Sequence, residues 1–82
     1  MIRINYRGRL AQLTDCTQEQ IEAARISDVL RHIRKRHGAK AYQEAGRLLI
    51  VVDRKSITLL ENRKTKLPEG CVVEFLPICG GG

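Results

Sequence analysis

The sequence predicts an α+β fold in which a mixed sheet of four to five strands has one main helix packed on one face. Three observations support this class. Residues of high β-propensity cluster near both ends of the chain, one strongly amphipathic segment lies between them, and turn-forming residues separate the runs. With 82 residues, 43% of them hydrophobic, the chain is expected to form a single core with little room for an internal active-site cavity.

The N-terminal segment alternates strictly between apolar and polar residues, which is the period of a half-buried strand. The residues expected to face the core are Ile2, Ile4 and Tyr6. Gly8 and the polar stretch 12–17 indicate a loop. A weaker alternation over residues 19–24 predicts a second strand, which would pair with the first as a hairpin.

A helix is predicted from Ser27, a good N-cap residue, with Asp28 in the first turn, where the helix dipole favours a negative charge. Its apolar stripe has the spacing i, i+3, i+4, i+7 and consists of Ile26, Val29, Leu30 and Ile33. Cations crowd its last turn and Gly38 is expected to end it. The polar segment 39–46 is compatible with another turn of helix.

Two β-rich runs follow, residues 48–52 and 57–60, separated by a polar turn that lacks the glycine of a tight hairpin. The first run is nearly all apolar, so it is expected to be buried on both sides or central in the sheet. Leu67-Pro68-Glu69-Gly70 has the chemistry of a type I turn with proline second. It precedes a last strand, residues 71–76, which would return beside the first strand, as in the β-grasp fold.

After this last strand the chain runs through Pro77 into Gly80, Gly81 and Gly82. Residues 1–77 are therefore expected to be the folded domain and residues 78–82 a flexible tail. A terminal carboxylate on a backbone without side chains can be threaded into a narrow pocket, because glycine adds no Cβ and adopts angles closed to other residues.

Composition limits the expected cellular location and the kinds of partner. No apolar run approaches the roughly 20 residues that span a bilayer, and the N-terminus does not resemble a signal peptide, so a cytoplasmic location is expected. The cysteines are Cys16, Cys71 and Cys79, an odd number without a CxxC pair, which suits a reducing compartment. The net charge of +6 would attract nucleic acid, an anionic membrane or an acidic partner.

Three segments together carry a resemblance to a known family: the strand Met1-Ile2-Arg3-Ile4, the helix start Ser27-Asp28-Val29-Leu30, and residues 66–77 with the terminal glycines. The last combines a Leu-Pro-x-Gly turn, a strand ending in Phe-Leu-Pro and a terminal Gly-Gly. On these motifs the chain resembles the ubiquitin-like sulfur carriers of the MoaD/ThiS family, and among them most closely the small subunits of molybdopterin synthase (molybdopterin-converting factor subunit 1).

The resemblance implies a carrier, or co-substrate, rather than an enzyme. An E1-like adenylyltransferase would use ATP to adenylate Gly82, and a sulfur donor such as a cysteine desulfurase or rhodanese would convert it to a thiocarboxylate. The large subunit of molybdopterin synthase, or another sulfur acceptor enzyme, would then take the sulfur for the molybdenum or tungsten cofactor. No cofactor would be bound by the carrier itself.

The resemblance also suggests roles for the residues near Gly82. Cys79, Gly80 and Gly81 would lie in the partner's channel, and Phe75, Leu76 and Pro77 would dock on the partner. Other interpretations compete with these roles. Phe75 would also serve as a core residue, as a lone aromatic in an alternating strand usually does. Cys79 would either be a small residue that merely fits at its position or be the site of a persulfide or acyl disulfide.

Three further functions stay open. A ubiquitin-like modifier would pass the activated glycine to a lysine amine, and a carrier for thiamine synthesis or tRNA thiolation would use the same tail. A nucleic-acid-binding module would use the basic helix, but three aromatic residues are few for a stacking platform. The basic run 34–37 is either a solvated helix end or a docking patch for an acidic partner.

His32 and His37 are the remaining candidates for chemistry. They are five residues apart, which is expected to point them to different sides of the helix, and no cysteine or carboxylate is expected to complete a ligand set. No metal site is therefore predicted.

Overall fold

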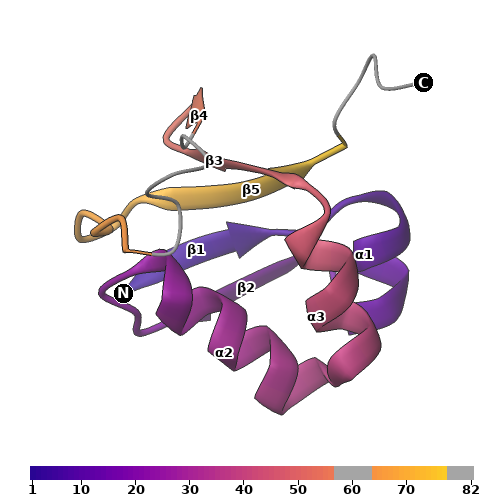
Figure 1. Ribbon diagram of the computed structural model, residues 1–82. Coiled ribbons are helices and arrows are strands. Elements are labelled where there is room, and N and C mark those ends of the chain that lie inside the picture. The colour runs from indigo at the N-terminus through magenta and orange to yellow at the C-terminus, as the bar shows by residue number, and fades with distance from the viewer. Residues whose placement is uncertain (57–63, 78–82) are drawn as a thin grey trace.

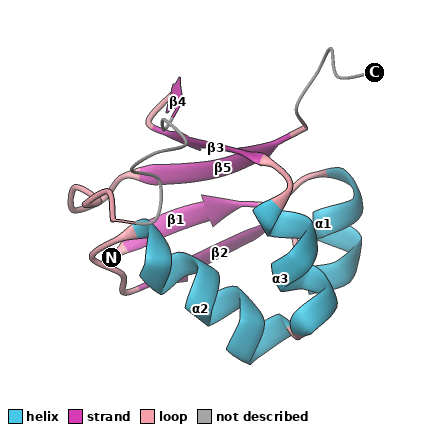
Figure 2. Ribbon diagram, in the orientation of Figure 1, coloured by secondary structure: helices cyan, strands magenta, loops and turns pink. Residues whose placement is uncertain are grey.

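The computed structural model describes residues 1–56 and 64–77, which form a five-stranded mixed sheet with helices on one face (Figures 1 and 2). The strands are β1 (Ile2–Asn5), β2 (Gln18–Ile21), β3 (Leu49–Val52), β4 (Lys55–Ser56) and β5 (Val72–Leu76). The helices are α1 (Gly8–Thr14), α2 (Ile26–His37) and α3 (Ala39–Gly46). The predicted α+β class is confirmed, and α2 is its main helix, with α1 and α3 beside it.

The strand order β2-β1-β5-β3-β4 places the last strand in the middle of the sheet. On one side β5 runs parallel to β1, with Ile4 opposite Val73, and on the other it runs antiparallel to β3, with Ile50 opposite Phe75. The predicted return of the last strand beside the first is confirmed. Strand β3 lies next to β5, and three of its four residues are buried, as its apolar sequence predicts.

The first two strands form the predicted antiparallel pair, with Ile2 opposite Ile21. The prediction of a loop between them is wrong, because seven of the intervening residues form helix α1. Only Leu10 and Thr14 of this helix are buried, so its sequence carries almost no periodic apolar signal. It ends at Asp15, whose φ of 58° is left-handed. Contacts with α3, rather than helix propensity, hold it in place.

Helix α2 buries all four residues of the predicted stripe. It begins earlier than predicted, with Arg25 rather than Ser27 at the N-cap. The cause is Asp28, whose carboxylate accepts hydrogen bonds from the backbone N–H groups of Ala24 and Arg25, each at 3.0 Å. This carboxylate replaces the cap that a Ser27 hydroxyl would have supplied.

Helix α3 is longer than the single turn that its sequence allowed. Gly38, at a φ of 98°, ends α2 and lets the chain reverse. Ala41 and Ala45 are then fully buried, and their small side chains allow α3 to pack closely beside α2. Its interface is therefore built from small residues rather than from a leucine or isoleucine stripe.

The turns also differ from expectation. Asp53 and Arg54 connect β3 to β4 with φ values of 47° and 70°, so two non-glycine residues occupy the left-handed region of a tight hairpin. Before β5 the N–H of Cys71 donates to the Pro68 carbonyl, at 3.1 Å, and Gly70 has a φ of 77°. The turn therefore spans 68–71, one residue later than predicted, because Gly70 takes its positive-φ position. The predicted strand 57–60 lies outside the described residues.

The Asp28 carboxylate should make the start of α2 sensitive to acid. The two backbone hydrogen bonds, first that of Ala24 and then that of Arg25, hold the pKa of Asp28 below its ordinary value. A depressed folded pKa contributes stability above the unfolded pKa of about 3.9, and this stability is lost as the pH falls through the folded pKa. We expect Asp28→Asn to lower the free energy of unfolding at pH 7 by about 0.5–1 kcal/mol, and the difference to shrink at pH 3.

Urea denaturation of both proteins at the two pH values measures this effect. Glu22→Gln is the matched control, since Glu22 is an exposed carboxylate in the preceding segment, and it should leave the unfolding free energy unchanged. An Asp28→Asn variant that is as stable as the wild type at pH 7 would contradict this account of the helix start.

Candidate functional site at the end of strand β5

The chain leaves the sheet at its most constrained strand. Side chains of β5 alternate between the core and the other face, with Val73 and Phe75 buried, Leu76 half-buried and the following Pro77 exposed. Because β3 pairs with β5 as far as Leu76, the last residue before Pro77 is fixed by main-chain pairing. Pro77 has no N–H to continue a strand. The point at which the chain leaves the sheet is therefore fixed.

A cleft of about 340 Å³ lies beside this exit. Its apolar lining is provided by Leu10, Leu48, Phe75 and Pro77. Figure 1 shows why these distant segments meet: the start of α1, the end of α3 and the end of β5 lie at the same end of the sheet. An apolar cleft beside the end of β5 is a suitable binding surface for a partner protein.

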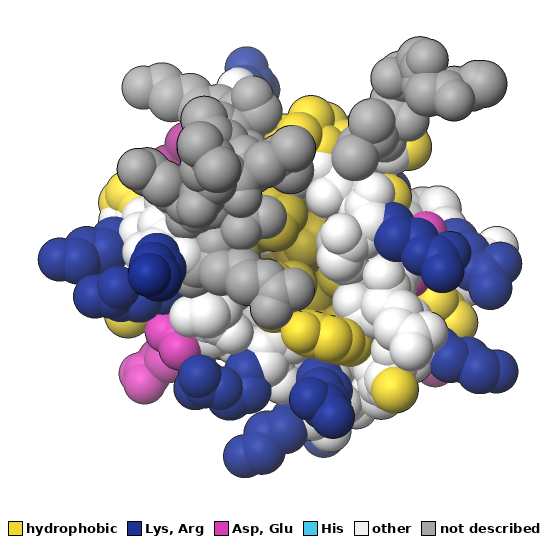
Figure 3. All heavy atoms as spheres, viewed as in Figure 1, with side chains coloured by type: hydrophobic (Ala, Val, Ile, Leu, Met, Phe, Trp, Pro, Cys, Tyr) yellow, Lys and Arg dark blue, Asp and Glu magenta, His cyan; other side chains and the backbone are white. Residues whose placement is uncertain are grey.

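The charged residues that border this cleft are Arg7, which precedes α1, Arg9 in α1 and Glu44 in α3. The Arg7 guanidinium lies 3.0 Å from the Glu74 carboxylate, and that of Arg9 lies 3.6 Å from Glu44. The two arginine side chains are 63% and 72% exposed, so both stay largely solvated. Lys and Arg side chains project around the edge of the face seen in Figure 3. The rim of the cleft would attract an acidic partner surface.

The structure sorts the predicted docking residues by burial. The Phe75 side chain is 1% exposed and stacks on Tyr6, with ring centroids 6.4 Å apart, so it is the core residue that the alternating pattern allowed. Leu76 and Pro77 remain accessible beside the cleft. Their docking role stays a prediction. Cys79, Gly80, Gly81 and Gly82 lie outside the described residues, as does the whole predicted tail.

Sequence reasoning did not identify Arg7, Arg9 and Glu44 as residues that line a cleft beside the end of β5. Arg7 precedes and Arg9 follows Gly8, which has a φ of 57° where the chain turns from β1 into α1. Gly8 is the available signal in the sequence, but it predicts a loop rather than the start of a helix. Their approach to Glu44 depends on the packing of α1 against α3, which no local pattern encodes.

The basic end of α2 is exposed at Arg34, Lys35 and Arg36. The Arg34 guanidinium lies over the Tyr42 ring, 5.7 Å from its centroid, a cation–π arrangement. These contacts fit a solvated helix end, and docking by this run stays a prediction.

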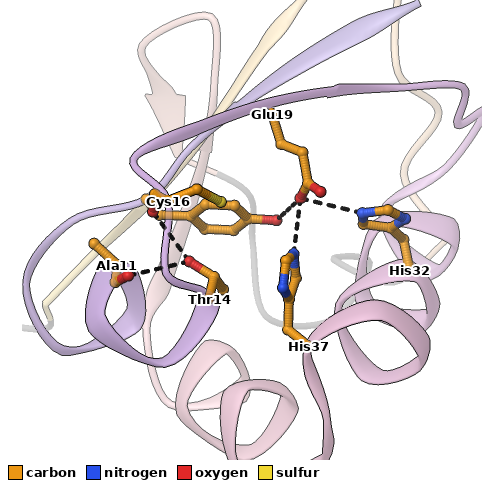
Figure 4. A network of polar contacts seen from close by, with 7 residues as sticks. Ala11, Thr14, Cys16, Glu19, His32 and His37 are labelled. Carbon is orange, nitrogen blue, oxygen red and sulfur yellow. Dashed lines mark hydrogen bonds and ion pairs between the residues drawn. The ribbon is translucent and has the colours of Figure 1, made fainter.

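The expectation for the two histidines is wrong. His32 and His37 converge on one carboxylate oxygen, Oε1 of Glu19, with Nε2 distances of 3.1 and 3.0 Å (Figure 4). Cys16 also lies within reach, because Cys16, Glu19 and His37 offer ligand atoms within 4.8 Å of one another. Five positions turn a helix by about 140°, which separates the two histidines, but β2 places Glu19 between them.

Hydrogen bonding decides the ionisation of this carboxylate. Burial raises the pKa of Glu19, but hydrogen bonds from His37 and Tyr6, together with the close contact of His32, outweigh burial, so the net pKa lies below its ordinary value. Burial, and then the hydrogen bond to Glu19, raise the pKa of the Tyr6 hydroxyl. Glu19 is therefore an anion and Tyr6 a neutral donor, bonded at 2.7 Å.

Cys71, at the start of β5, is not suited to act as a nucleophile. Burial raises the pKa of its thiol, and the Asp53 carboxylate raises it further. The thiol is therefore protonated at neutral pH.

Within residues 1–56 and 64–77, no helix is long and apolar enough to cross a membrane.

Comparison with known proteins identifies a family and a shared fold. The model of the ThiS family matches residues 4–82. The chain is similar to a solved Pyrococcus furiosus protein assigned as molybdopterin converting factor, subunit 1, with a TM-score of 0.73 and 26% identity over 93% of this chain and 94% of that one. A sequence search of curated proteins found no match.

Two further solved structures share the fold at lower identity. SAMP1 from Haloferax volcanii has a TM-score of 0.72 and 13% identity over 99% of this chain and 98% of that one. A complex of subunits 1 and 2 of molybdopterin-converting factor from Helicobacter pylori contains a chain with a TM-score of 0.68 and 20% identity, over 99% of this chain and 97% of that one. The predicted β-grasp, ubiquitin-like fold is confirmed.

The burial of β5 predicts a sharp contrast between adjacent residues. We expect Phe75→Ala to lower the free energy of unfolding by about 3–5 kcal/mol, because it empties a fully buried site. Leu76→Ala should cost about 1 kcal/mol, because that side chain is half-buried. Urea denaturation of the two variants tests this directly. Similar small losses in both would mean that Phe75 is not a core residue.

Proposed function

Because the chain belongs to the ThiS family of ubiquitin-like sulfur carriers, we propose that it carries sulfur as a thiocarboxylate on Gly82. The observation that supports this most is that the family match extends to residue 82 and so includes the terminal glycines. The geometry of β5 adds to it, since a rigid central strand ends immediately before the tail.

The proposed chemistry begins at an activating enzyme. An E1-like adenylyltransferase joins the Gly82 carboxylate to the AMP part of ATP and releases pyrophosphate. A sulfur donor of the cysteine desulfurase or rhodanese type then attacks the acyl carbon with its persulfide sulfur and displaces AMP. A thiol reduces the resulting acyl disulfide, which leaves the thiocarboxylate on Gly82 and a disulfide on the donor. ATP is used by the activating enzyme, and the carrier holds no cofactor.

On this proposal the carrier contributes presentation rather than catalysis. Gly80 and Gly81 have no side chains, so they can follow the acyl carbon into a narrow channel, and Cys79 would lie at its entrance. The folded body supplies the half-buried Leu76 and the exposed Pro77 beside a cleft bordered by Arg7 and Arg9. It acts as a co-substrate and is not itself an enzyme.

The acceptor that fits best is the large subunit of a molybdopterin synthase, in synthesis of the molybdenum or tungsten cofactor. The support is the similarity to the Pyrococcus protein assigned as molybdopterin converting factor, subunit 1. Thiamine synthesis and tRNA thiolation use the same tail chemistry and are the alternative pathways. Cysteines without a CxxC pair suit a carrier that works in the reducing cytoplasm.

Intact-mass measurement tests the activated carbon. After incubation with the host's E1-like enzyme, ATP and a sulfur donor, the chain should gain the mass of one sulfur replacing one oxygen. A chain extended by one residue past Gly82 should not react, because its carboxylate is displaced from the adenylation site. Equal adenylation of the extended chain would refute the proposal. Attachment to other proteins through lysine would instead identify a ubiquitin-like modifier.

Gly81→Ala separates the tail from the fold. We expect this variant to have the unfolding curve of the wild type and to lose most of its sulfur transfer, because the added Cβ obstructs the channel. Unfolding of the variant with transfer intact per folded molecule would contradict this role of the tail.

Charge reversal tests which basic surface meets the activating enzyme. We expect Arg9→Glu to raise the KM for adenylation about three- to tenfold, with the larger effect at low salt, because Arg9 borders the cleft beside the tail. Arg36→Glu is the matched control, an equal charge change on the exposed end of α2. An equal or larger effect of Arg36→Glu would assign docking to the helix end.

A further inference from the structure

Side chains from different parts of the chain gather around the Glu19 carboxylate, between β2 and the end of α2 (Figure 4). Cys16 follows α1, Glu19 is in β2, and His32 and His37 are in α2. Ligand atoms of Cys16, Glu19 and His37 lie within 4.8 Å of one another, and Nε2 of His32 lies 3.1 Å from Glu19 Oε1. The sulfur-carrier chemistry proposed above uses none of them.

More side-chain groups contact Glu19 Oε1 than this oxygen has lone pairs to accept hydrogen bonds. This oxygen lies 2.7 Å from the Tyr6 hydroxyl, 3.0 Å from His37 Nε2 and 3.1 Å from His32 Nε2. A carboxylate oxygen offers two lone pairs. The contact left over is that of His32, whose Nε2 is buried and makes no aligned hydrogen bond. An imidazole nitrogen is therefore directed into the cluster without a suitable donor or acceptor.

We propose that Cys16, Glu19, His32 and His37 bind one Zn²⁺ ion. Thiolate, imidazole and carboxylate are the ligands that zinc takes in proteins, at bond lengths of about 2.0–2.3 Å. Around a tetrahedral ion such ligand atoms are about 3.3–3.6 Å apart. Nε2 of His37 needs to move out from Glu19 by a few tenths of an ångström, and the Cys16 sulfur needs to approach by about 1 Å. His32 contacts Glu19 but lies outside the group of ligand atoms within 4.8 Å of one another, so its side chain has to turn toward Cys16 and His37 to complete the ligand set.

Charge and protonation are consistent with a divalent ion. Zinc binding releases the thiol proton of Cys16 to solvent, and each histidine then binds through Nε2 with its proton on Nδ1. The thiolate and the Glu19 carboxylate together balance the two positive charges. The ion also replaces the crowded contacts at Oε1 with coordination, and His32 Nε2 gains a partner.

The surrounding contacts hold the ligands in place before a metal binds. Tyr6 donates to Glu19 and orients its carboxylate, a role typical of groups that support metal ligands. Thr14 Oγ1 donates to the Cys16 carbonyl at 3.0 Å and so fixes the turn that carries the thiol. The side chains of His37, Glu19 and His32 are 10%, 20% and 27% exposed, which leaves a path from solvent.

The site would act as a structural link. It joins the turn after α1, the edge strand β2 and the last turns of α2, three segments that are distant in the sequence. An ion that binds the folded chain but not the unfolded one stabilises the fold by mass action. Small domains with limited cores commonly gain stability in this way.

Cobalt substitution tests the ligands directly. Metal-free full-length protein, reduced and titrated with Co²⁺, should bind one ion per chain and develop the visible bands of tetrahedral cobalt with a thiolate-to-cobalt charge-transfer band. Zn²⁺ should displace the cobalt and raise the thermal midpoint. Cys16→Ser should remove the charge-transfer band and weaken zinc binding more than tenfold. Glu19→Gln, His32→Asn and His37→Gln should each weaken zinc binding about tenfold or more.

Matched controls separate this site from other metal binding. Cys79→Ser removes another thiol and Glu22→Gln an exposed carboxylate near β2, and both should keep the cobalt spectrum and zinc affinity of the wild type. Circular dichroism identifies any variant that fails to fold, and Cys16→Ser, the smallest change, then decides the outcome. Zinc binding by the wild type no tighter than by Cys16→Ser, or loss of the charge-transfer band in Cys79→Ser, would overturn the proposal.

Discussion

Strand β5 hydrogen-bonds to β1 on one side and to β3 on the other, and most of the structure depends on this double pairing. The last strand completes the sheet that the earlier strands leave open, and it brings Val73 and Phe75 into the core under the helices. The turn that starts β5 is tied to the beginning of the chain, where the Gly70 N–H donates to the Met1 carbonyl at 2.9 Å. The residues that lead into the tail therefore cannot shift without breaking the sheet, which separates a rigid body from the segment that a partner would bind.

Tyr6 connects the core below the tail with the cluster around Glu19. Its ring stacks on Phe75 and meets His37 edge-on, with centroids 5.9 Å apart, while its hydroxyl donates to Glu19. One side chain immediately after β1 thus contacts the central strand on one side and the α2–β2 junction on the other. An aromatic residue with a polar end suits this position, because the ring can be buried while the hydroxyl reaches a partner.

The sequence predicted the elements whose burial follows a regular period: β1, the stripe of α2, and β5. It did not predict α1, in which only Leu10 and Thr14 are fully buried, or the length of α3, whose buried residues are the small Ala41 and Ala45. The helix start moved from Ser27 because Asp28 reaches back to the preceding N–H groups. The histidine cluster had no local signal, because tertiary packing of α2 over β2 brings Glu19 between side chains five residues apart. The basic rim of the cleft depends in the same way on the packing of α1 against α3.

The proposed function requires the tail to be bound by partners without loosening the folded body, and the arrangement of the sheet is compatible with this requirement. The exit from β5 and the Glu19 cluster are separated in the sheet by β1, so a contact at the cleft does not need to disturb the groups that hold β2 and α2 together. Tension on the tail falls on a strand paired along both edges rather than on an edge strand. The edge strand β2, with four residues, is the weaker element, and it is there that Cys16, Glu19 and the two histidines gather. The Glu19 cluster and the exit of the chain thus lie on different strands, with Tyr6 as the side chain that contacts both regions.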